Sequence, residues 1–330
     1  MKYLYLILIF ISFIVTFYLT PWVIKYMRKI GIVVKDLNKK NKPLIPLSGG
    51  FAVLAGIFTS IMFIIFIKTF IYNSTSELIF LFAALTSIIF ITLVGFIDDL
   101  LIKRNRESSA GLKQWQKPLL TLTAAVPLMV VNAGVTVVSL PLFGNIDIGL
   151  FYPLFIIPIS VVIAANMVNM LAGFNGMECG MGIIYTFSLG LYSYLYGTQV
   201  GALIAFSTFG SLLAFYFFNK YPAKILPGDS LTYLLGGVIA CIGILGNIER
   251  AAIIVSIPFI VEFFLKARSK FKAQSYGYFK NGKIYSKYNK IYSITHIFTK
   301  SGKFTEKEIV IFMLLIESFF SILIWFLPIS

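Results

Sequence analysis

Charged residues are scarce in this chain of 330 residues. They make up 12% of it, and 58% of the residues are hydrophobic. Soluble domains carry about 25% charged residues. So few polar groups cannot cover a water-facing globule of this length. The excess apolar surface has to be buried in lipid, which excludes an ordinary soluble fold.

Histidine and cysteine are also scarce. The single histidine, His296, excludes a histidine-rich zinc site, and the two cysteines, Cys179 and Cys241, give neither a disulfide framework nor a zinc-ligand spacing. No segment matches GxxxxGK[ST], so the chain is not a P-loop enzyme. A net charge of +15 would suggest nucleic acid for a soluble protein. In a membrane protein, orientation and phosphate-bearing ligands explain it better, and we expect no nucleic-acid partner.

Long apolar runs dominate what is present. They lack the period-two alternation of barrel strands, and helices satisfy their own backbone in lipid. The runs therefore predict an all-α integral membrane protein with about ten transmembrane helices in one domain, 1–330. The expected spans lie near 3–24, 50–72, 77–97, 117–138, 150–167, 180–197, 200–218, 230–247, 250–266 and 308–328. The first run could be a signal peptide, but its length and the lack of a small-residue cleavage site favour an uncleaved span.

The basic residues predict the orientation. Of the 28 lysines and arginines, 25 fall in four loops that ten spans place on one side: 25–48, 98–117, 219–229 and 266–307. The positive-inside rule predicts that this side of the cell membrane is cytoplasmic and that both termini lie on the outer side. The longest connection on the outer side, 134–149, alternates apolar residues around Pro141 and Gly144, which predicts a small extracytoplasmic β-hairpin.

Few acidic residues are available, so their positions are informative. Asp98 and Asp99 end an expected span, where two adjacent carboxylates repel each other unless a cation or a base role uses them. Asp229 follows Pro227 and Gly228 on the same side; it can cap the next helix or serve the site.

The segment 166–178 carries three asparagines and Glu178 on that side, without a basic residue. Asn166 and Asn169 lie three residues apart, so a helix presents both on one face. Amides are costly in lipid, and they suit either metal and ligand contacts or hydrogen bonds between helices. Together with the carboxylates they form an oxygen-rich set suited to Mg²⁺, which keeps waters and binds substrate phosphates.

These segments resemble the polyprenyl-phosphate N-acetylhexosamine-1-phosphate transferases, the glycosyltransferase 4 family, over most of the chain and in the same order. The matching segments are Asn41-Lys-Pro-Leu-Ile-Pro-Leu-Ser-Gly-Gly50, the pair Asp98-Asp99, Gln114-Trp-Gln-Lys117, the segment from Asn166 to Glu178, and Gly228-Asp229-Ser230. The group that fits best is that of the dolichyl-phosphate GlcNAc-1-phosphotransferases, and an archaeal source is expected. The last loop lacks the histidine-rich motif of the bacterial branches, and a looser match, 266–272, resembles an arginine-containing segment that contacts the sugar.

The resemblance implies helices around a groove on the cytoplasmic face. It implies Mg²⁺, with Mn²⁺ as an alternative, held by Asn169 and Asp229. It implies catalytic roles for Asp98, Asp99 and Lys117, and a place near uracil for Asn175. Further substrate contacts are expected from Lys42, Asn166, Glu178 and Arg268. A homodimer is the assembly that the family suggests.

The function expected on this basis is transfer of GlcNAc-1-phosphate, or another N-acetylhexosamine-1-phosphate, from a UDP-sugar to a polyprenyl or dolichyl phosphate. The products are UMP and a lipid-diphosphate sugar, the first membrane step of glycan assembly, with N-glycans expected. Alternatives are a phospho-MurNAc-pentapeptide or undecaprenyl-phosphate transferase of the same superfamily, and a secondary transporter. A transporter would place its ionisable residues near the midplane, whereas the acidic residues here mostly lie at the cytoplasmic ends of the spans, with Glu317 as an exception. A structural scaffold would leave the acidic and amide cluster unexplained.

Overall fold

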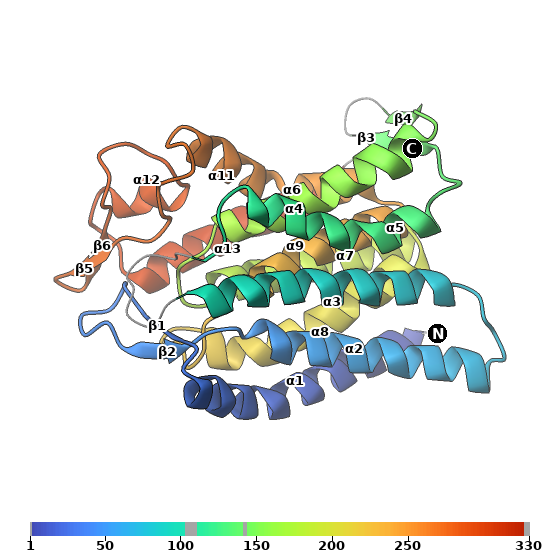
Figure 1. The fold of residues 1–330 in the computed structure, drawn as a ribbon, viewed down its shortest axis with the longest axis horizontal. Coiled ribbons are helices and arrows are strands. Elements are labelled where there is room, and N and C mark those ends of the chain that lie inside the picture. The colour runs from blue at the N-terminus through green and yellow to red at the C-terminus, as the bar shows by residue number, and fades with distance from the viewer. Residues whose placement is uncertain (1, 103–110, 141–143, 327–330) are drawn as a thin grey trace.

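The protein is described from a computed structural model. The structure describes all residues except 1, 103–110, 141–143 and 327–330. Long helices run roughly side by side along the longest dimension of the molecule (Figure 1). The basic residues Lys103, Arg104 and Arg106 and the turn residue Pro141, which the sequence analysis used, lie outside the described residues.

The elements follow the chain in a simple order. The first half contains α1 Lys2–Ile30, β1 Val33–Lys35, β2 Leu44–Pro46, α2 Gly50–Phe66, the π-helix Ile67–Ile71, α3 Leu78–Leu101, α4 Gln116–Thr121, the 3₁₀ helix Leu122–Ala125, α5 Val126–Val131, β3 Val137–Leu140, β4 Gly144–Asp147 and the π-helix Tyr152–Ile156. The second half contains α6 Ile157–Met170, α7 Met177–Tyr196, α8 Gln199–Asn219, α9 Gly228–Gly246, α10 Glu249–Val255, α11 Ile257–Ala267, β5 Tyr278–Lys280, β6 Lys283–Tyr285, α12 Thr295–Thr299, α13 Glu306–Leu323 and the 3₁₀ helix Ile324–Phe326.

Seven helical segments of the described residues are long and apolar enough to cross a membrane. They are Tyr3–Ile30, Gly50–Ile71, Leu78–Leu101, Tyr152–Met170, Gln199–Asn219, Gly228–Gly246 and Glu306–Phe326. The chain is therefore a multi-pass membrane protein. The remaining three expected spans coincide with the shorter stretch α4–α5, with α7, and with the interrupted pair α10–α11. The count of ten spans stays a prediction.

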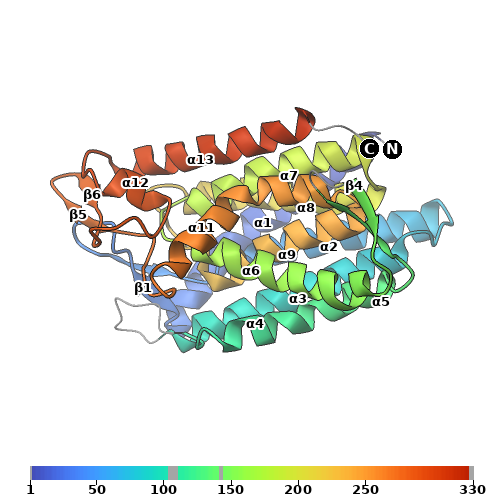
Figure 2. The same ribbon diagram turned by 90° about the horizontal axis from the view of Figure 1, so that it is seen from above.

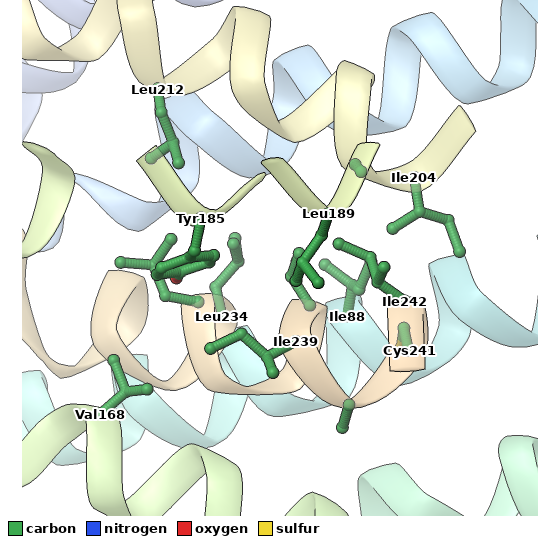
Figure 3. Close-up of a cluster of buried hydrophobic side chains, with 14 of the residues drawn as sticks. Ile88, Val168, Tyr185, Leu189, Ile204, Leu212, Leu234, Ile239, Cys241 and Ile242 are labelled. Carbon is green, nitrogen blue, oxygen red and sulfur yellow. The ribbon is translucent and has the colours of Figure 1, made fainter. Parts of the chain in front are cut away.

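Helix α9 forms the centre of the bundle. It packs against α2, α3, α6 and α8, and all of its residues from Ser230 to Gly246 are buried. Small residues allow this close approach, since a Cβ on Gly236 would collide with the backbone of α6 at Ala164. Figure 3 shows part of the apolar cluster around α9, including Ile88, Tyr185, Leu234 and Ile242.

Three small antiparallel sheets interrupt the helical pattern, and they lie at opposite ends of the bundle (Figure 2). The pair β3–β4, in the segment 134–149, has Val137 opposite Asp147. It lies at the end where α1 begins. The pairs β1–β2 and β5–β6 lie at the other end, where β5–β6 is beside α12 (Figures 1 and 2). The sequence analysis did not predict these last two pairs, which shape the end where the basic loops meet.

Candidate active site

Asp99 is a buried carboxylate of the site that is surrounded by hydrogen-bond donors of the protein. It lies near the end of α3, is 1% exposed, and its two oxygens accept hydrogen bonds from the backbone N–H groups of Asp229 at 2.8 Å and Ser230 at 3.2 Å. Ser48 donates a third bond from its hydroxyl at 2.7 Å. The N-terminus of a helix carries unpaired N–H groups and partial positive charge. Asp99 therefore caps α9 from a neighbouring helix and fixes the position of Asp229.

The segment that contains Ser48 is itself joined to the loop before α9. Leu226 donates its N–H to the carbonyl of Pro46 at 2.8 Å, and Gly49 donates its N–H to the carbonyl of Leu226 at 3.2 Å. Gly228 has φ +70, and a Cβ there would collide with the Asp99 carboxylate. Glycine takes this backbone conformation without strain, and only a residue without a Cβ leaves space for the carboxylate. The segment from Asn41 to Gly50 thus helps to build the turn that carries Asp229.

Lys117 joins the other two carboxylates. Its ammonium group contacts Asp98 directly and lies 3.2 Å from Oδ2 of Asp229. The second oxygen of Asp98 accepts the N–H of Leu112 at 2.5 Å, so Gly111 and Leu112 lie against this carboxylate. The structure therefore brings together Asp98, Asp99, Lys117 and Asp229, which come from three helices.

Asn169 completes this group from the last turn of α6. Its amide nitrogen donates to Oδ2 of Asp229 at 3.2 Å, and its amide oxygen accepts the hydroxyl of Thr232 at 2.9 Å. Asn166, one turn earlier, donates to the hydroxyl of Thr121 at 3.3 Å and to the carbonyl of Val162. The two amides line the same cavity, as their spacing predicted.

The cavity beside these residues has a volume of about 590 Å³ and lies between the loops at one end of the bundle. Seven residues singled out from the sequence line it: Asp99, Lys117, Asn166, Asn169, Asn175, Glu178 and Asp229. Asp98 reaches it through its contact with Lys117. Lys42 and Arg268 are not part of the lining, whereas Lys35, Lys266 and Lys272 are. The basic wall is therefore made by neighbours of the two residues that the sequence suggested.

Asn175 belongs to a second polar group at the far wall of the cavity. Its side-chain amide donates to Asp36 at 3.0 Å, and its N–H donates to Glu306 at 2.9 Å. Lys39 contacts both of these carboxylates. Glu178 accepts the N–H of Gly173 at 2.6 Å and so closes the turn between α6 and α7.

Sequence reasoning missed Asp36, Asn38, Ser48 and Glu306. Asp36 and Asn38 lie in the first basic loop and Glu306 lies in the last one, so the predicted location of these loops on one side of the membrane was the signal that could have found them. The contacts of Asp36 and Glu306 with Asn175 join residues more than one hundred positions apart, which no local pattern reveals.

Comparison with known proteins identifies the family to which these residues belong. The family model described as "Glycosyl transferase family 4" matches residues 81–247, which span α3 to α9 and hold Asp98, Lys117, Asn169 and Asp229. The chain belongs to glycosyl transferase family 4.

Similar family 4 proteins include one from Saccharolobus solfataricus, with the proposed assignment UDP-N-acetylglucosamine–dolichyl-phosphate N-acetylglucosaminephosphotransferase. It is 38% identical over 96% of this chain and 94% of its own length. The enzyme of that name from Dictyostelium discoideum is 27% identical over 76% of this chain and 68% of its own. A phospho-N-acetylmuramoyl-pentapeptide-transferase from Halalkalibacterium halodurans is 32% identical over 78% of this chain and 79% of its own.

The donor set of this family 4 site is suited to a cation of the magnesium type. Asp98, Asp99, Asp229 and Lys117 together carry a formal charge of minus two when all are ionised, which a divalent cation balances. Among the described residues, no three His, Cys, Asp or Glu side chains form a complete metal site. Ligation would have to include an amide, waters or substrate phosphate, which Mg²⁺ commonly uses. If the Asn169 amide rotated by half a turn, its oxygen would lie on the Asp229 side.

The hydrogen bond from Ser48 to Asp99 gives a stability test. Because Ser48→Ala leaves a buried carboxylate with one donor fewer, we expect a loss of about 2 kcal/mol in unfolding free energy. The transition temperature in detergent, followed by circular dichroism, should fall. The matched control is Ser87→Ala, since Ser87 is equally buried in α3 and its hydroxyl has no partner among the described residues. Equal stability of the two variants would show that Ser48 does not support Asp99.

Proposed function

We propose that this protein transfers N-acetylglucosamine-1-phosphate, or another N-acetylhexosamine-1-phosphate, from a UDP-sugar to a polyprenyl or dolichyl phosphate. The observation that carries the proposal is the cluster of Asp98, Lys117, Asn169 and Asp229 at the edge of a large cavity. This cluster lies in the region that matches the family, and relatives over nearly the whole chain carry names for this reaction.

The reaction needs charge to be neutralised on two phosphates. The phosphate oxygen of the lipid attacks the β-phosphorus of the UDP-sugar, the bond from that phosphorus to the bridging oxygen breaks, and UMP leaves. Mg²⁺, or Mn²⁺ in its place, would be held by Asp229 and Asn169 and would supply positive charge to the diphosphate. The Lys117 ammonium would bind phosphate oxygens, since it already lies among the carboxylates.

The two adjacent aspartates are assigned different roles. Asp99 accepts three hydrogen bonds from protein groups, so its role is to hold the turn that carries Asp229. Asp98 contacts the ammonium of Lys117 and one backbone N–H, that of Leu112. We assign to Asp98 the orientation or deprotonation of the lipid phosphate.

The far wall of the cavity supports recognition of a nucleotide. The Asn38 Oδ1 and Glu178 Oε2 atoms are buried acceptors in the cavity lining, and neither has a hydrogen-bond donor among the described residues. A buried acceptor without a donor is costly. The N–H of a uracil and the hydroxyls of a ribose would satisfy such atoms, and Asn175, which donates to Asp36, lines the same cavity.

We also propose that the cavity opens to the cytoplasm and that both termini lie outside. Segments of all four basic loops line the cavity, at residues such as Lys35, Leu112, Leu226 and Lys272. Loops rich in lysine and arginine stay on the cytoplasmic side.

The reaction itself is tested by UMP release from UDP-GlcNAc in the presence of polyprenyl phosphate. We expect release with Mg²⁺ and none after chelation. Asp98→Asn and Asp229→Asn should each lower turnover by at least about 100-fold, because they remove charge that acts on the transferring phosphate. Asp147→Asn, in the strand β4 at the other end of the bundle, is the matched control and should keep full turnover. Uptake of a sugar nucleotide into proteoliposomes without UMP formation would instead favour a transporter.

Lys117 gives a second test, by metal binding. Lys117→Met removes the ammonium group that contacts Asp98 and Asp229. Without that competing charge, electron paramagnetic resonance should detect Mn²⁺ bound at least as tightly as in the wild type, while UMP release falls by at least about 100-fold. Lys113→Met, an exposed neighbour, should change neither. Loss of Mn²⁺ binding in Lys117→Met would contradict the assignment of the metal to Asp229 and Asn169.

Orientation is tested by labelling single cysteines in intact cells with a membrane-impermeant thiol reagent. The two native cysteines are buried and should not react. Thr75→Cys, in the exposed loop between α2 and α3, should be labelled from outside. Lys300→Cys, exposed beside α12, should be labelled only in inverted vesicles. The opposite pattern would place the cavity outside the cell.

A further inference from the structure

One wall of the cavity has no helix or strand of its own. The segment 272–276, called the strap here, contributes all five of its residues to the lining, Lys272, Gln274 and Tyr276 among them. A backbone without regular structure must find hydrogen-bond partners elsewhere when it is buried. The side chains that bind the backbone of the strap include residues to which the proposed reaction assigns no role.

Gln274, at the middle of the strap, is held at both of its backbone groups. Its N–H donates to the hydroxyl of Tyr288 at 3.1 Å, and its carbonyl lies 2.8 Å from Nε2 of His296. The rings of Tyr288 and His296 stack with their centroids 5.2 Å apart. His296 is 1% exposed and does not line the cavity, so its hydrogen bond to Gln274 links it to the cavity wall.

The tautomer of His296 follows from its second contact. Its Nδ1 atom accepts the backbone N–H of Tyr292 at 3.2 Å. The ring proton therefore resides on Nε2, where it is donated to the Gln274 carbonyl. Burial lowers the pKa of His296, which keeps the ring neutral and Nδ1 able to accept.

The neighbours of Gln274 are held in the same way. Lys266 donates to the carbonyl of Ala273 at 2.7 Å, and Thr295 donates to the carbonyl of Ser275 at 2.5 Å. Three consecutive carbonyls of the strap are thus bound by side chains from α11 and α12.

Glu262 joins the two supporting segments behind the strap. This carboxylate of α11 is fully buried. It accepts the hydroxyl of Ser275 at 3.2 Å and the N–H of Ile294 at 2.8 Å, and Lys266 lies 3.5 Å away. The two carboxylate oxygens therefore fix the strap and the start of α12 relative to each other.

We propose that Glu262, Tyr288 and His296 are positioning residues for the sugar-nucleotide donor, because they hold the strap and thereby set the donor-facing wall formed by Lys272, Gln274 and Tyr276. The inference rests on the proposed function. The strap belongs to the segment that lies with β5, β6 and α12 at the end of the bundle (Figure 2), beyond the membrane-length helices. A water-soluble substrate reaches that end from the solvent, whereas a lipid phosphate arrives from the bilayer.

The test is His296→Phe in the full-length protein in detergent, with initial rates of UMP release measured against each substrate in turn. Phenylalanine keeps the ring that stacks on Tyr288 and removes both nitrogen contacts. We expect the KM for UDP-GlcNAc to rise about tenfold, the effect of one hydrogen bond, with kcat and the KM for polyprenyl phosphate within about twofold of the wild type. His296→Gln, which restores a side-chain N–H, should recover most of the loss. Lys300→Ala, exposed at the end of α12, is the matched control and should leave all three constants unchanged.

Other outcomes overturn the inference. These are an equal rise in both KM values, a fall in kcat alone, or no change. If His296→Phe does not fold, Tyr288→Phe decides: it removes the hydroxyl that binds Gln274 and should raise only the KM for UDP-GlcNAc. Calorimetric binding of UDP-GlcNAc, measured in parallel, separates this inference from the function. Absence of UMP release by the wild type would refute the proposed function, whereas unweakened UDP-GlcNAc binding by the variants would refute the role of the strap.

Discussion

The buried contact between Asp99 and the N-terminus of α9 is the constraint on which the site depends. An ionised carboxylate in a protein interior is stable only when donors surround it. Here the donors are two backbone N–H groups of the α9 turn and the hydroxyl of Ser48. This contact joins α3, α9 and the first loop, so it places Asp229 beside Asp98, Lys117 and Asn169. Without this contact, no hydrogen bond from Asp99 would hold the start of α9, which carries Asp229, against the end of α3, which carries Asp98.

Much of this site could be predicted because topology alone brings distant residues to one side of a membrane. The count of apolar runs and the position of the basic loops placed Asp98, Lys117, Asn169 and Asp229 on the same face. The helical spacing of Asn166 and Asn169 put both amides toward the cavity. The motifs in order indicated glycosyl transferase family 4, which the family comparison confirmed.

The rest depends on contacts that no local pattern contains. Adjacent aspartates look equivalent in a sequence, yet Asp99 is enclosed by protein donors while Asp98 contacts a lysine. The sequence singled out Lys42 and Arg268, but cavity lining depends on loop conformation, and Lys35 and Lys272 lie there instead. His296 looked like an ordinary loop residue, and only its bonds to Gln274 and Tyr292 show what it supports.

The most direct measurement of the central claim is a structure of the protein with UDP-GlcNAc and Mn²⁺, with the metal located by its anomalous scattering. The account predicts a single strong peak within coordination distance of Asp229 and Asn169, with the diphosphate between that ion and Lys117. A metal bound elsewhere, or a nucleotide outside the cavity formed by the four basic loops, would contradict it.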